Sequence, residues 1–584
     1  TASVDPPAAP PAPPAPVPPS DAAVRAKQLE ALLAEHWEYT LQRSPEMASS
    51  LGDKRYNDKW SDRSPEAIAA DLARTQAFLT RFEAISPTGF TVQQALDHRI
   101  IVRQLRERLA NAKFEDWLMP VTQFGGVHIR LPQLVSQLSF ATVKDYEDYI
   151  ARLTAVPVVF DQTIALMQQG ISKQLVPPRL ILDQCLSQTQ TLAKVKPAES
   201  PFAAPIQKFP ETISTADQQR LRGAVLAAIQ DKVLPAYASF ATYLRTTYLA
   251  KGRKELGYSS LPDGPARYAA RIKEMTTTDL SADEIHAIGL GEVTRIEGEQ
   301  TEIAKRLGFA SLEAFRKHVR TDKKLYAKSR EAILASYQRY TDLMYAKLPA
   351  LFGHLAKAKM IIKPVESFRE KQAAGANYNA GSDDGVRPGA VQVNTYEPTK
   401  RLAFDAESIA YHEGVPGHHF QISIQRELTQ LPAFRRHARF TAFSEGWGLY
   451  SERLGKEVGL YTDPYNDYGR LQSEMLRAIR LVVDTGVHHK QWSRAQVVKF
   501  FHDHSTIDEP SVQAETDRYI ANPAQALAYK IGQLTISRLR ERAQDALGTR
   551  FDVRAFHDEV LGAGALPLDV LEQRIDAWIA RTKA

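Results

Sequence analysis

Cysteine is almost absent from this sequence, and so are long apolar runs. The 584 residues include one cysteine, Cys185, which excludes an intramolecular disulfide and fits either a reducing compartment or a cysteine-poor exported protein. No uninterrupted apolar stretch approaches the roughly 20 residues that a membrane-spanning helix needs. We therefore expect a chain without a transmembrane segment.

A strong excess of charge of one sign is also missing. The 74 basic and 68 acidic side chains are mixed along the chain and leave a formal charge of +6. The densest basic group, FRRHARF, is typical of a solvated helix face rather than of a nucleic-acid footprint. We expect no nucleic-acid partner. The 43% of hydrophobic residues is an ordinary globular share and allows a substantial core.

The first 20 residues, TASVDPPAAPPAPPAPVPPS, consist mainly of proline and alanine and lack an initiator methionine. Such a composition has little capacity to bury surface and predicts a disordered tether over residues 1–20. A tether that follows a removed signal peptide is typical of exported bacterial proteins, some of them lipid-anchored. This pattern predicts a location in the bacterial periplasm or cell envelope, with an expression scar or a simple linker as the alternative.

Helical spacing of apolar residues dominates the chain after position 20. Leucines recur at that spacing in the stretch that begins at Asp21. Ser64 precedes Pro65 as an N-cap residue precedes a proline in the first helical turn. Ser281 and Glu284 have the spacing of a capping box before another periodic apolar face. Segments typical of strands are few, so the sequence predicts a mainly α fold.

One segment, GAVQVNTY, has the alternation of a strand. Val391 and Val393 fall on one face, and Gln392 and Asn394 on the other. It follows a stretch rich in Gly, Asn and Asp. The segment is either an ordinary half-buried hairpin strand or an active-site edge strand that hydrogen-bonds an extended peptide. In the second interpretation Gln392 and Asn394 are substrate-binding residues.

The motif YHEGVPGHHF begins like the H-E-x-x-H helix of a zinc hydrolase and then departs from it. Two histidines share one zinc when they lie one helical turn apart, as residues i and i+4 do. The residue four positions after His412 is Pro416, and Gly417 then tolerates unusual backbone angles, so a bulge or kink is expected. In a straight helix His419 is about 10 Å further along. If two residues are looped out, His418 reaches the one-turn position.

A third metal ligand is available on a second predicted helix. The stretch FTAFSEGWGLYSERL places Glu445 among large apolar side chains, with Glu452 seven residues later. A carboxylate in such surroundings is costly to bury unless it is paired or ligated. Together with two histidines, Glu445 would leave the fourth position of a zinc site open for water. An exposed glutamate on an amphipathic helix is the alternative.

The sequence HEGVPGHHFQ followed by EGWGLYSE resembles the bacterial family known as domain of unknown function 885, within the gluzincin group of metallopeptidases. It is more distantly similar to thimet oligopeptidase and carboxypeptidase Taq, whose H-E-x-G-H motif would carry a two-residue insertion here. The resemblance extends from about Leu29 to the C-terminus. It implies His412 and His418 as histidine ligands, Glu445 as third ligand and Glu413 as general base.

The resemblance also has consequences for the fold. It implies a mainly α, two-lobed body with a deep central cleft that selects short unfolded peptides, and a small β element near the active site. Residues 21–280 would form one wall of the cleft, and residues 281–584 would form the catalytic region. The insertion leaves the choice between His418 and His419 open, since His419 could instead hydrogen-bond a ligand.

Peptide hydrolysis also needs a donor for the oxyanion that develops at the carbonyl. His488, Tyr519 and Tyr529 are the candidates for this catalytic role. Gln525 and Arg518, in the same C-terminal stretch, are candidates for substrate binding.

Two arginines, Arg480 and Arg518, could clamp the terminal carboxylate of an exopeptidase substrate through bidentate hydrogen bonds. Structural ion pairs with nearby acids such as Glu474 and Glu515 are the alternative. Exopeptidase and endopeptidase action both stay open at this point.

The prediction that results is a metallopeptidase with one zinc ion that cleaves short peptides. Glu413 would take a proton from the attacking water and later pass one to the leaving amine. Zinc is favoured over iron or manganese because two histidines, a glutamate and an open position suit it. A zinc amidase acting on cell-wall-derived fragments is a first alternative. A non-catalytic peptide-binding protein with a retained metal site is a second, which the presence of a general base disfavours.

Overall fold

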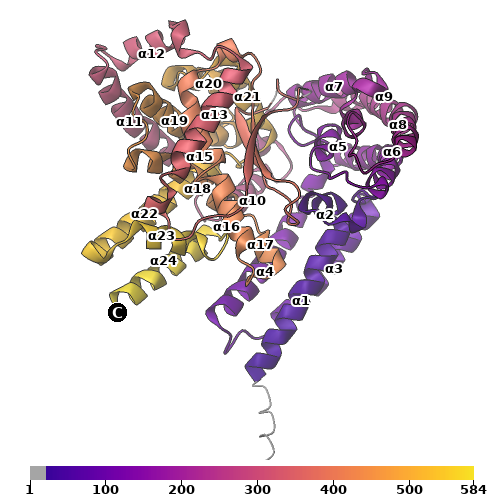
Figure 1. Cartoon of the computed structure of the whole chain (residues 1–584), viewed down its shortest axis with the longest axis horizontal. Helices are drawn as coiled ribbons and strands as arrows, with labels where there is room; N and C mark the ends of the chain where they lie inside the picture. The colour runs from indigo at the N-terminus through magenta and orange to yellow at the C-terminus, as the bar shows by residue number, and fades with distance from the viewer. Residues whose placement is uncertain (1–20, 368, 372) are drawn as a thin grey trace, which may run out of the picture.

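Helices form nearly all of the regular structure of the chain, and the expected mainly α fold is confirmed (Figure 1). The computed structural model describes residues 21–367, 369–371 and 373–584, so the tether predicted for residues 1–20 lies outside it. The N-terminal part contains α1 (Asp21–Arg43), α2 (Pro45–Leu51), α3 (Pro65–Glu83), α4 (Val92–Ala112), α5 (Val127–Val135), α6 (Val143–Ser172), α7 (Arg179–Ala193), α8 (Thr215–Ala228) and α9 (Leu234–Tyr243). The middle contains α10 (Gly264–Thr276), α11 (Ala282–Arg306), α12 (Leu312–Thr321), α13 (Arg330–Tyr345) and α14 (Leu348–Leu351). The C-terminal part contains α15 (Ala406–Glu413), α16 (His418–Glu427), α17 (Ala433–Arg436), α18 (Thr441–Glu457), α19 (Pro464–His488), α20 (Arg494–His504), α21 (Glu509–Ala521), α22 (Leu527–Leu547), α23 (Val553–Leu561) and α24 (Leu568–Lys583).

Two helices begin at the capping residues from which the sequence predicted their starts. The Ser64 side chain accepts a hydrogen bond from the Ala67 amide, and Pro65 occupies the first turn of α3. At α11 both halves of the capping box are present, because Ser281 accepts from the Glu284 amide and the Glu284 carboxylate accepts from the Ser281 amide. These contacts satisfy amide groups that a helix start otherwise leaves without partners.

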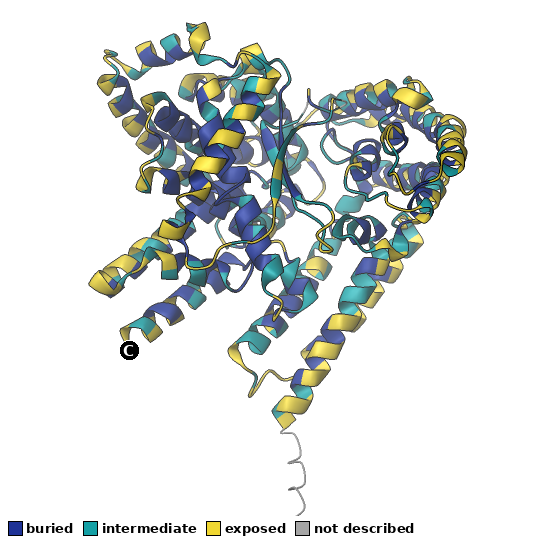
Figure 2. Cartoon of the chain, viewed as in Figure 1, coloured by how far each residue is buried: buried dark blue, intermediate teal, exposed yellow. Residues whose placement is uncertain are grey.

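Helices α5 to α9 gather on one side of the molecule, and α11 to α15 with α18 to α24 lie on the other (Figure 1). The two largest hydrophobic clusters nevertheless join residues from both sides of position 280. One includes Phe160 with Ile479, and the other includes Phe78 with Trp447. Figure 2 shows the buried helices at the centre of the part that contains α18 and α19. The division expected at residue 280 therefore does not separate two hydrophobic cores.

Helix α6 is long and apolar enough, by length and composition alone, to be considered as a membrane span. Of its most apolar window, 44% is buried within the protein. Val156, Phe160 and Met167 on this helix belong to the same hydrophobic cluster as residues of α9 and α19. Within the described residues no other helix passes that test, and no clear transmembrane span emerges.

A three-stranded sheet contains the segment predicted as a strand, but that segment is not at an edge. The strands are β1 (Met360–Pro364), β2 (Ala376–Asn379) and β3 (Gly389–Val393), in the order β1-β3-β2. The central strand β3 pairs in parallel with β1 and antiparallel with β2. All five residues of β3 are buried and the strand is central, so the expectation of an edge strand was wrong; β1 and β2 are the edges.

Two helices that carry site residues approach each other closely because both have a glycine at the crossing. A Cβ atom added to Gly446 of α18 would lie 2.4 Å from the backbone of Gly532 in α22. One added to Gly532 would lie 1.9 Å from the carbonyl oxygen of Ala442. A larger side chain at either position would push the helices apart. This contact fixes α18, which carries Glu445, against α22, which carries Tyr529.

Candidate metal centre

The motif that departs from H-E-x-x-H forms two helices with a short loop between them. Helix α15 ends at Glu413 and α16 begins at His418. The loop turns tightly, because the Gly417 amide donates to the Tyr411 carbonyl at 2.9 Å. A Cβ atom at Gly417 would lie only 1.9 Å from the His412 carbonyl oxygen, so the turn requires glycine there. The loop returns His418 to the side of His412.

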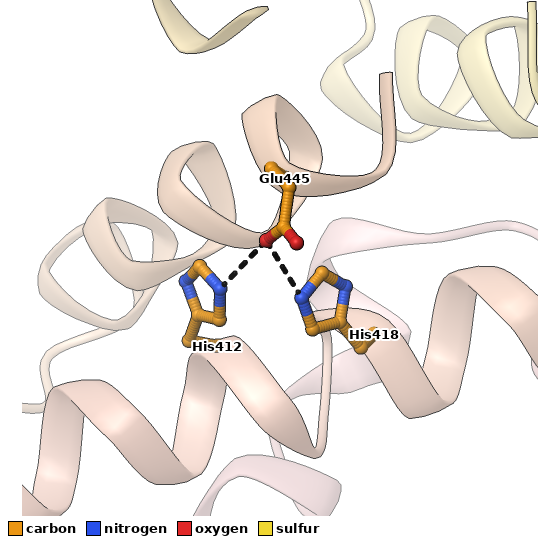
Figure 3. A group of neighbouring side chains, drawn as sticks. All are labelled: His412, His418 and Glu445. Carbon is orange, nitrogen blue, oxygen red and sulfur yellow. Dashed lines mark hydrogen bonds and ion pairs between the residues drawn. The ribbon is translucent and has the colours of Figure 1, made fainter. Parts of the chain in front are cut away.

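Three potential ligand atoms converge at this point (Figure 3). One carboxylate oxygen of Glu445, Oε2, lies 3.1 Å from Nε2 of His418 and 3.5 Å from Nε2 of His412. The two imidazole rings are almost perpendicular, with centroids 4.7 Å apart. All three ligand atoms lie within 4.8 Å of one another, an arrangement that could hold a metal ion. Two nitrogens and one carboxylate oxygen are the donor types of a catalytic zinc site.

The electrostatics of the three residues are strongly coupled. Burial disfavours charge on Glu445, but His418 and His412 outweigh it and hold the pKa of this carboxyl well below its usual range. Burial also opposes charge on His412, yet hydrogen bonds to Glu445 and Glu452 raise its pKa to about 9. The carboxylates therefore favour a cation at this position, which an imidazolium or a metal ion can supply.

A fourth side chain, Glu452, orients one of the two imidazole rings. Its Oε1 lies 2.8 Å from Nδ1 of His412, on the ring edge opposite the nitrogen that faces Glu445. Histidine ligands of metals commonly donate their other ring N–H to a carboxylate in this way. Gly448, on the same helix as both glutamates, leaves room for the ring. A Cβ atom there would lie 2.8–3.1 Å from three atoms of His412.

His419 lies away from this centre. Its Nδ1 is 3.0 Å from the Tyr378 hydroxyl on β2, and its Nε2 is 3.1 Å from the Ala358 carbonyl. The side chain is 1% exposed, and burial lowers its pKa to about 4. Of the two histidines that sequence reasoning left open, the structure places His418 beside His412.

A cavity of about 370 Å³ opens beside the metal centre, and His412 and Glu413 both line it. The other lining residues come from α13, the ends of β2 and β3, α15, α19, α21 and α22. Among the described residues, all those that line it lie between Lys324 and Tyr529. The N-terminal region, expected as a cleft wall, contributes none of these lining residues, but it contacts an element that does. There Gln123 donates to the Asp517 carbonyl of α21.

The structure brings Tyr529 and Arg518 to the cavity, with Gln525 behind them. The Tyr529 ring stacks near the His412 imidazole, with centroids 6.1 Å apart and an interplanar angle of 18°. Arg518 donates to the Tyr529 hydroxyl at 3.0 Å and to the Gln525 amide oxygen at 2.7 Å. Gln525 therefore contacts the site through Arg518 and is not itself among the lining residues.

Two of the proposed oxyanion donors are not brought to the cavity. The Tyr519 hydroxyl accepts from Arg480 and donates to Glu515, and the side chain is 1% exposed. His488 is fully buried at the end of α19. Its Nδ1 accepts from the Tyr258 amide and its Nε2 lies 2.8 Å from the Tyr519 carbonyl. Both side chains are occupied by internal contacts.

The side chains of Gln392 in β3 and of Asn394, just after this strand, are also occupied internally rather than free to bind a substrate. Gln392 is 0% exposed, and its amide oxygen accepts from Asn377 and Asn379 of the neighbouring strand. Asn394 donates to the carbonyls of Glu370 and Ala373 and accepts from the Tyr396 amide. Asn394 lines the cavity but its polar atoms hold the preceding loop. Central placement of the strand accounts for this difference.

The predicted ion pairs of the arginines are present in part. Glu515 bridges Arg480 at 2.8 Å and Arg518 at 3.2 Å, so both arginines have the structural partner expected as the alternative. Glu474 instead pairs with Lys530 at 2.7 Å. Arg480 and Arg518 nevertheless line the cavity, together with Arg477.

A family model described as "Bacterial protein of unknown function (DUF885)" matches residues 45–575. The chain belongs to this family. No curated protein matches the chain. The resemblance drawn from the HEGVPGHHFQ and EGWGLYSE motifs is thereby confirmed at the level of the family.

Solved structures agree with the fold. A "putative lipoprotein" from Colwellia psychrerythraea superposes with a TM-score of 0.90 and 28% identity, over 95% of this chain and 100% of that one. A "putative lipoprotein of unknown function" from Shewanella oneidensis gives a TM-score of 0.69 and 16% identity, over 94% and 99%. A "putative oligoendopeptidase F" from Bacillus anthracis covers 88% of this chain at 13% identity, but its TM-score of 0.29 is too low to support an argument.

Sequence reasoning noted Glu452 without giving it a role and missed Arg477 and Gly448. The spacing of Glu445 and Glu452 held a usable signal, because residues seven apart lie on one face of a helix. Both carboxylates of α18 consequently reach the His412 ring. Gly448 lies between them and gives that ring its space.

Proposed function

We propose that this protein is a zinc-dependent hydrolase that cleaves peptide bonds in short peptides. The observation that carries the proposal is the convergence of His412, His418 and Glu445 beside a cavity that Glu413 also lines. A site with three protein ligands keeps a coordination position open, as catalytic zinc sites do, whereas structural zinc sites are closed by four.

The residues present fit a zinc ion. Two imidazole nitrogens face one carboxylate oxygen, a further carboxylate orients one imidazole, and the pairing favours positive charge at the centre. When bound, zinc would supply Lewis acidity that polarises a carbonyl and lowers the pKa of a water molecule. Every other step of the reaction falls to side chains of the chain itself.

Glu413 is proposed as the general base. It directly follows His412 in α15 and lines the cavity, with 9% of the residue exposed. Its carboxylate would take a proton from the attacking water and later give one to the leaving amine. The Glu413 carboxylate is mostly shielded from solvent and forms no hydrogen bond or ion pair with the described residues, so it is available for this exchange.

Tyr529 is proposed as the donor that stabilises the developing oxyanion. Its hydroxyl accepts a hydrogen bond from Arg518, which leaves the hydroxyl proton free to be donated toward the cavity. The cationic partner also makes that proton a stronger donor. Its ring lies beside His412, so the hydroxyl belongs to the same site. The buried Tyr519 and His488 are not part of this proposal.

The size of the cavity favours short peptides. About 370 Å³ lies in the lower range of small-ligand sites and is too small for a folded protein surface. Gly375 and Ala376, at the start of edge strand β2, line it. An extended peptide could add to that edge by main-chain hydrogen bonds. In this proposal β2, rather than the predicted segment β3, is the edge strand that hydrogen-bonds an extended peptide.

We also propose that the protein works in the bacterial cell envelope. Two structurally similar proteins, from Colwellia psychrerythraea and Shewanella oneidensis, are named lipoproteins. An N-terminal lipid anchor would hold such a protein at a membrane surface without a transmembrane helix. Peptides released in the envelope would then be the available substrates.

The test is a time course of a mixed synthetic peptide library with the zinc-loaded protein, followed by mass spectrometry. Glu413→Gln is compared with Glu541→Gln, which changes an exposed glutamate of α22 outside the cavity. We expect cleavage by the parent and by Glu541→Gln. The Glu413→Gln protein should lose at least about 100-fold in rate while it keeps its zinc, measured by elemental analysis.

Three results would contradict the proposal. Equal cleavage by Glu413→Gln and the parent would show that the activity does not use this centre. A zinc-loaded parent that leaves every peptide intact, yet opens cell-wall-derived amides, would assign the site to an amidase. Retained zinc with neither activity would leave a binding protein.

A further inference from the structure

Three arginines form a positively charged wall of the cavity beside the metal centre. Arg477 and Arg480 project from α19, and Arg518 projects from α21. Their guanidinium carbons lie 5.8, 4.3 and 5.9 Å from the centroid of the Tyr529 ring. That ring is stacked beside His412. The arginine wall is thus separated from a metal ligand by the thickness of one aromatic ring.

Two of the three arginines are buried but not fully satisfied. Arg477 is 7% exposed and Arg480 is 3% exposed. Within the described residues, Nε of Arg477 and Nη1 of Arg480 have no hydrogen-bond partner. Buried N–H donors without an acceptor are rare because each forfeits its hydrogen bonds to water. Arg477 and Arg480 therefore line the cavity with hydrogen-bonding capacity that the described residues do not use, although these two atoms are themselves shielded from it.

The local charge also calls for an anion. Glu515 is shared between Arg480 and Arg518, and Glu452, at 3.6 Å from Arg477, also serves His412. Besides Glu445 and Glu413 at the metal centre, two carboxylates therefore pair with the three guanidinium groups. Glu515 itself is desolvated, yet Arg480 and Arg518 lower its pKa to about 2, so it remains a fixed anion that orients both arginines.

Among the described residues, four acidic ones line the cavity: Glu515 pairs with the arginines, Glu413 lies beside the metal centre, and Asp405 and Asp508 precede helices. Asp508 caps the start of α21, whereas Arg518 stands in the last turn of the same helix. Ten residues at 1.5 Å each separate them by about 15 Å along the helix axis. Asp405 is similarly placed before α15, about 12 Å along the helix from Glu413. Asp508 therefore lies well away from Arg518. Burial raises the pKa of Asp405, and the charge of Arg477 acts against that rise.

We propose that Arg477, Arg480 and Arg518 form a subsite for the free C-terminal carboxylate of a peptide, so that the enzyme removes residues from peptide C-termini. The inference rests on the proposed hydrolase function and adds the substrate class. Guanidinium groups bind carboxylates through paired, directional hydrogen bonds. Because the arginine wall adjoins the metal centre, a carboxylate held there places the last peptide bond near the metal ligands. A peptide that continues past this point would have to bring an uncharged amide against the same wall.

The test compares three N-acetylated tripeptides that differ at the end: Ac-Ala-Phe-Leu as the free acid, the same peptide as its amide, and Ac-Ala-Phe-Glu amide. The last peptide carries a side-chain carboxylate but no terminal one. We expect kcat/KM for the free acid to exceed that for either amide by about 100-fold, as for loss of one partner of a buried charged pair. Binding of each peptide to zinc-loaded Glu413→Gln protein, measured by calorimetry, should show the same order.

Substitutions of arginine test whether the preference for the free acid over the amide depends on this subsite. Arg518→Gln should reduce the ratio of acid to amide by at least about 10-fold, mainly through KM, and Arg518→Lys should fall between it and the parent. Arg494→Gln is the matched control, because Arg494 pairs with Asp517 and does not line the cavity. It should keep the parent ratio. Thermal melts confirm that each variant is folded.

Each result is decisive. Equal cleavage of acid and amide overturns the subsite while it leaves the hydrolase proposal standing. If the glutamyl amide is cleaved as fast as the free-acid peptide, the three arginines bind a side-chain carboxylate equally well. That result overturns the assignment of the subsite to the C-terminal carboxylate. If no peptide is cleaved, the order of the binding affinities measured by calorimetry tests the subsite independently of catalysis. Tighter binding of the acid, lost in Arg518→Gln, supports the subsite, and equal binding overturns it.

Discussion

Oε1 of Glu452 lies 2.8 Å from Nδ1 of His412, while Nε2 of the same ring faces Glu445 at 3.5 Å. One imidazole is thus held between two carboxylates of the same helix, two turns apart. Glu452 fixes the orientation of the ring. Glu445 lies on the side of the ring that faces the candidate metal centre. The affinity of the centre should consequently depend on a residue that is not itself a ligand.

We expect Glu452→Gln to weaken zinc binding by about 10- to 100-fold, because the ring loses its charged partner. Competition with a fluorescent zinc chelator measures the change. Glu457→Gln, at the end of the same helix and paired with Arg540, is the control and should keep the parent affinity. Unchanged affinity in Glu452→Gln would contradict the orienting role.

The two adjacent histidines of the motif should behave differently. His418→Ala should abolish stoichiometric zinc binding, because it removes one of three converging ligand atoms. His419→Ala should retain one zinc per chain, since this ring contacts Tyr378 and Ala358 instead. Elemental analysis after dialysis against a weak chelator distinguishes them. Zinc retained by His418→Ala but lost from His419→Ala would reverse the ligand assignment.

Zinc affinity should depend on the space beside the His412 ring as well as on the residues that hydrogen-bond to it. In Gly448→Ala the new methyl group would meet ring atoms at 2.8–3.1 Å, so the ring or helix α18 must shift. We expect zinc affinity to fall by at least about 10-fold, as for other disturbed supporting contacts. Gly291→Ala, at an exposed position of α11 with nothing within 4 Å, should keep the affinity. It should also raise stability by up to about 1 kcal/mol.

A buried acid away from the metal centre should govern part of the pH dependence of stability. Asp484 is fully buried, accepts from the Tyr268 hydroxyl and the Ala524 amide, and has its pKa raised to about 7, mainly by burial. A carboxyl with a raised pKa in the folded state stabilises the fold below its unfolded pKa. That contribution is lost as the pH rises from about 4 to about 7.

The loss amounts to as much as roughly 4 kcal/mol. Asp484→Asn, which cannot ionise, should remove this part of the pH dependence. Urea denaturation of metal-free protein at pH 5 and pH 8 provides the comparison. We expect the parent to lose more stability between the two values than Asp484→Asn does. Parallel losses in both proteins would show that Asp484 does not titrate in this range.

Several features could be predicted because they depend on neighbouring residues alone. The capping box of Ser281 and Glu284 and the start of α3 at Pro65 are local hydrogen-bond patterns, and both occur as expected. Helix α15 ends at Glu413, just before the glycines and proline that break a regular helix. The mainly α fold follows from the same periodicity, repeated along the chain.

Other expectations failed where the outcome depended on distant partners. The alternation of Val391 and Val393 indicates a strand, but two other segments determine whether a strand is central or at an edge. Gln392 could act on a substrate only if Asn377 and Asn379 did not already occupy its amide oxygen. His488 likewise meets Tyr258, which is 230 residues earlier in the chain.

Residue type and spacing within a few turns were enough to predict the helices, the interruption after Glu413 and the short list of groups able to bind a metal. The choice between His418 and His419, the position of Glu452 behind His412 and the grouping of Arg477, Arg480 and Arg518 around Tyr529 depended on tertiary packing. The physical reason is that burial and charge pairing are set by segments far apart in the chain. The same glutamate or arginine is a surface ion pair or part of a site according to what packs against it.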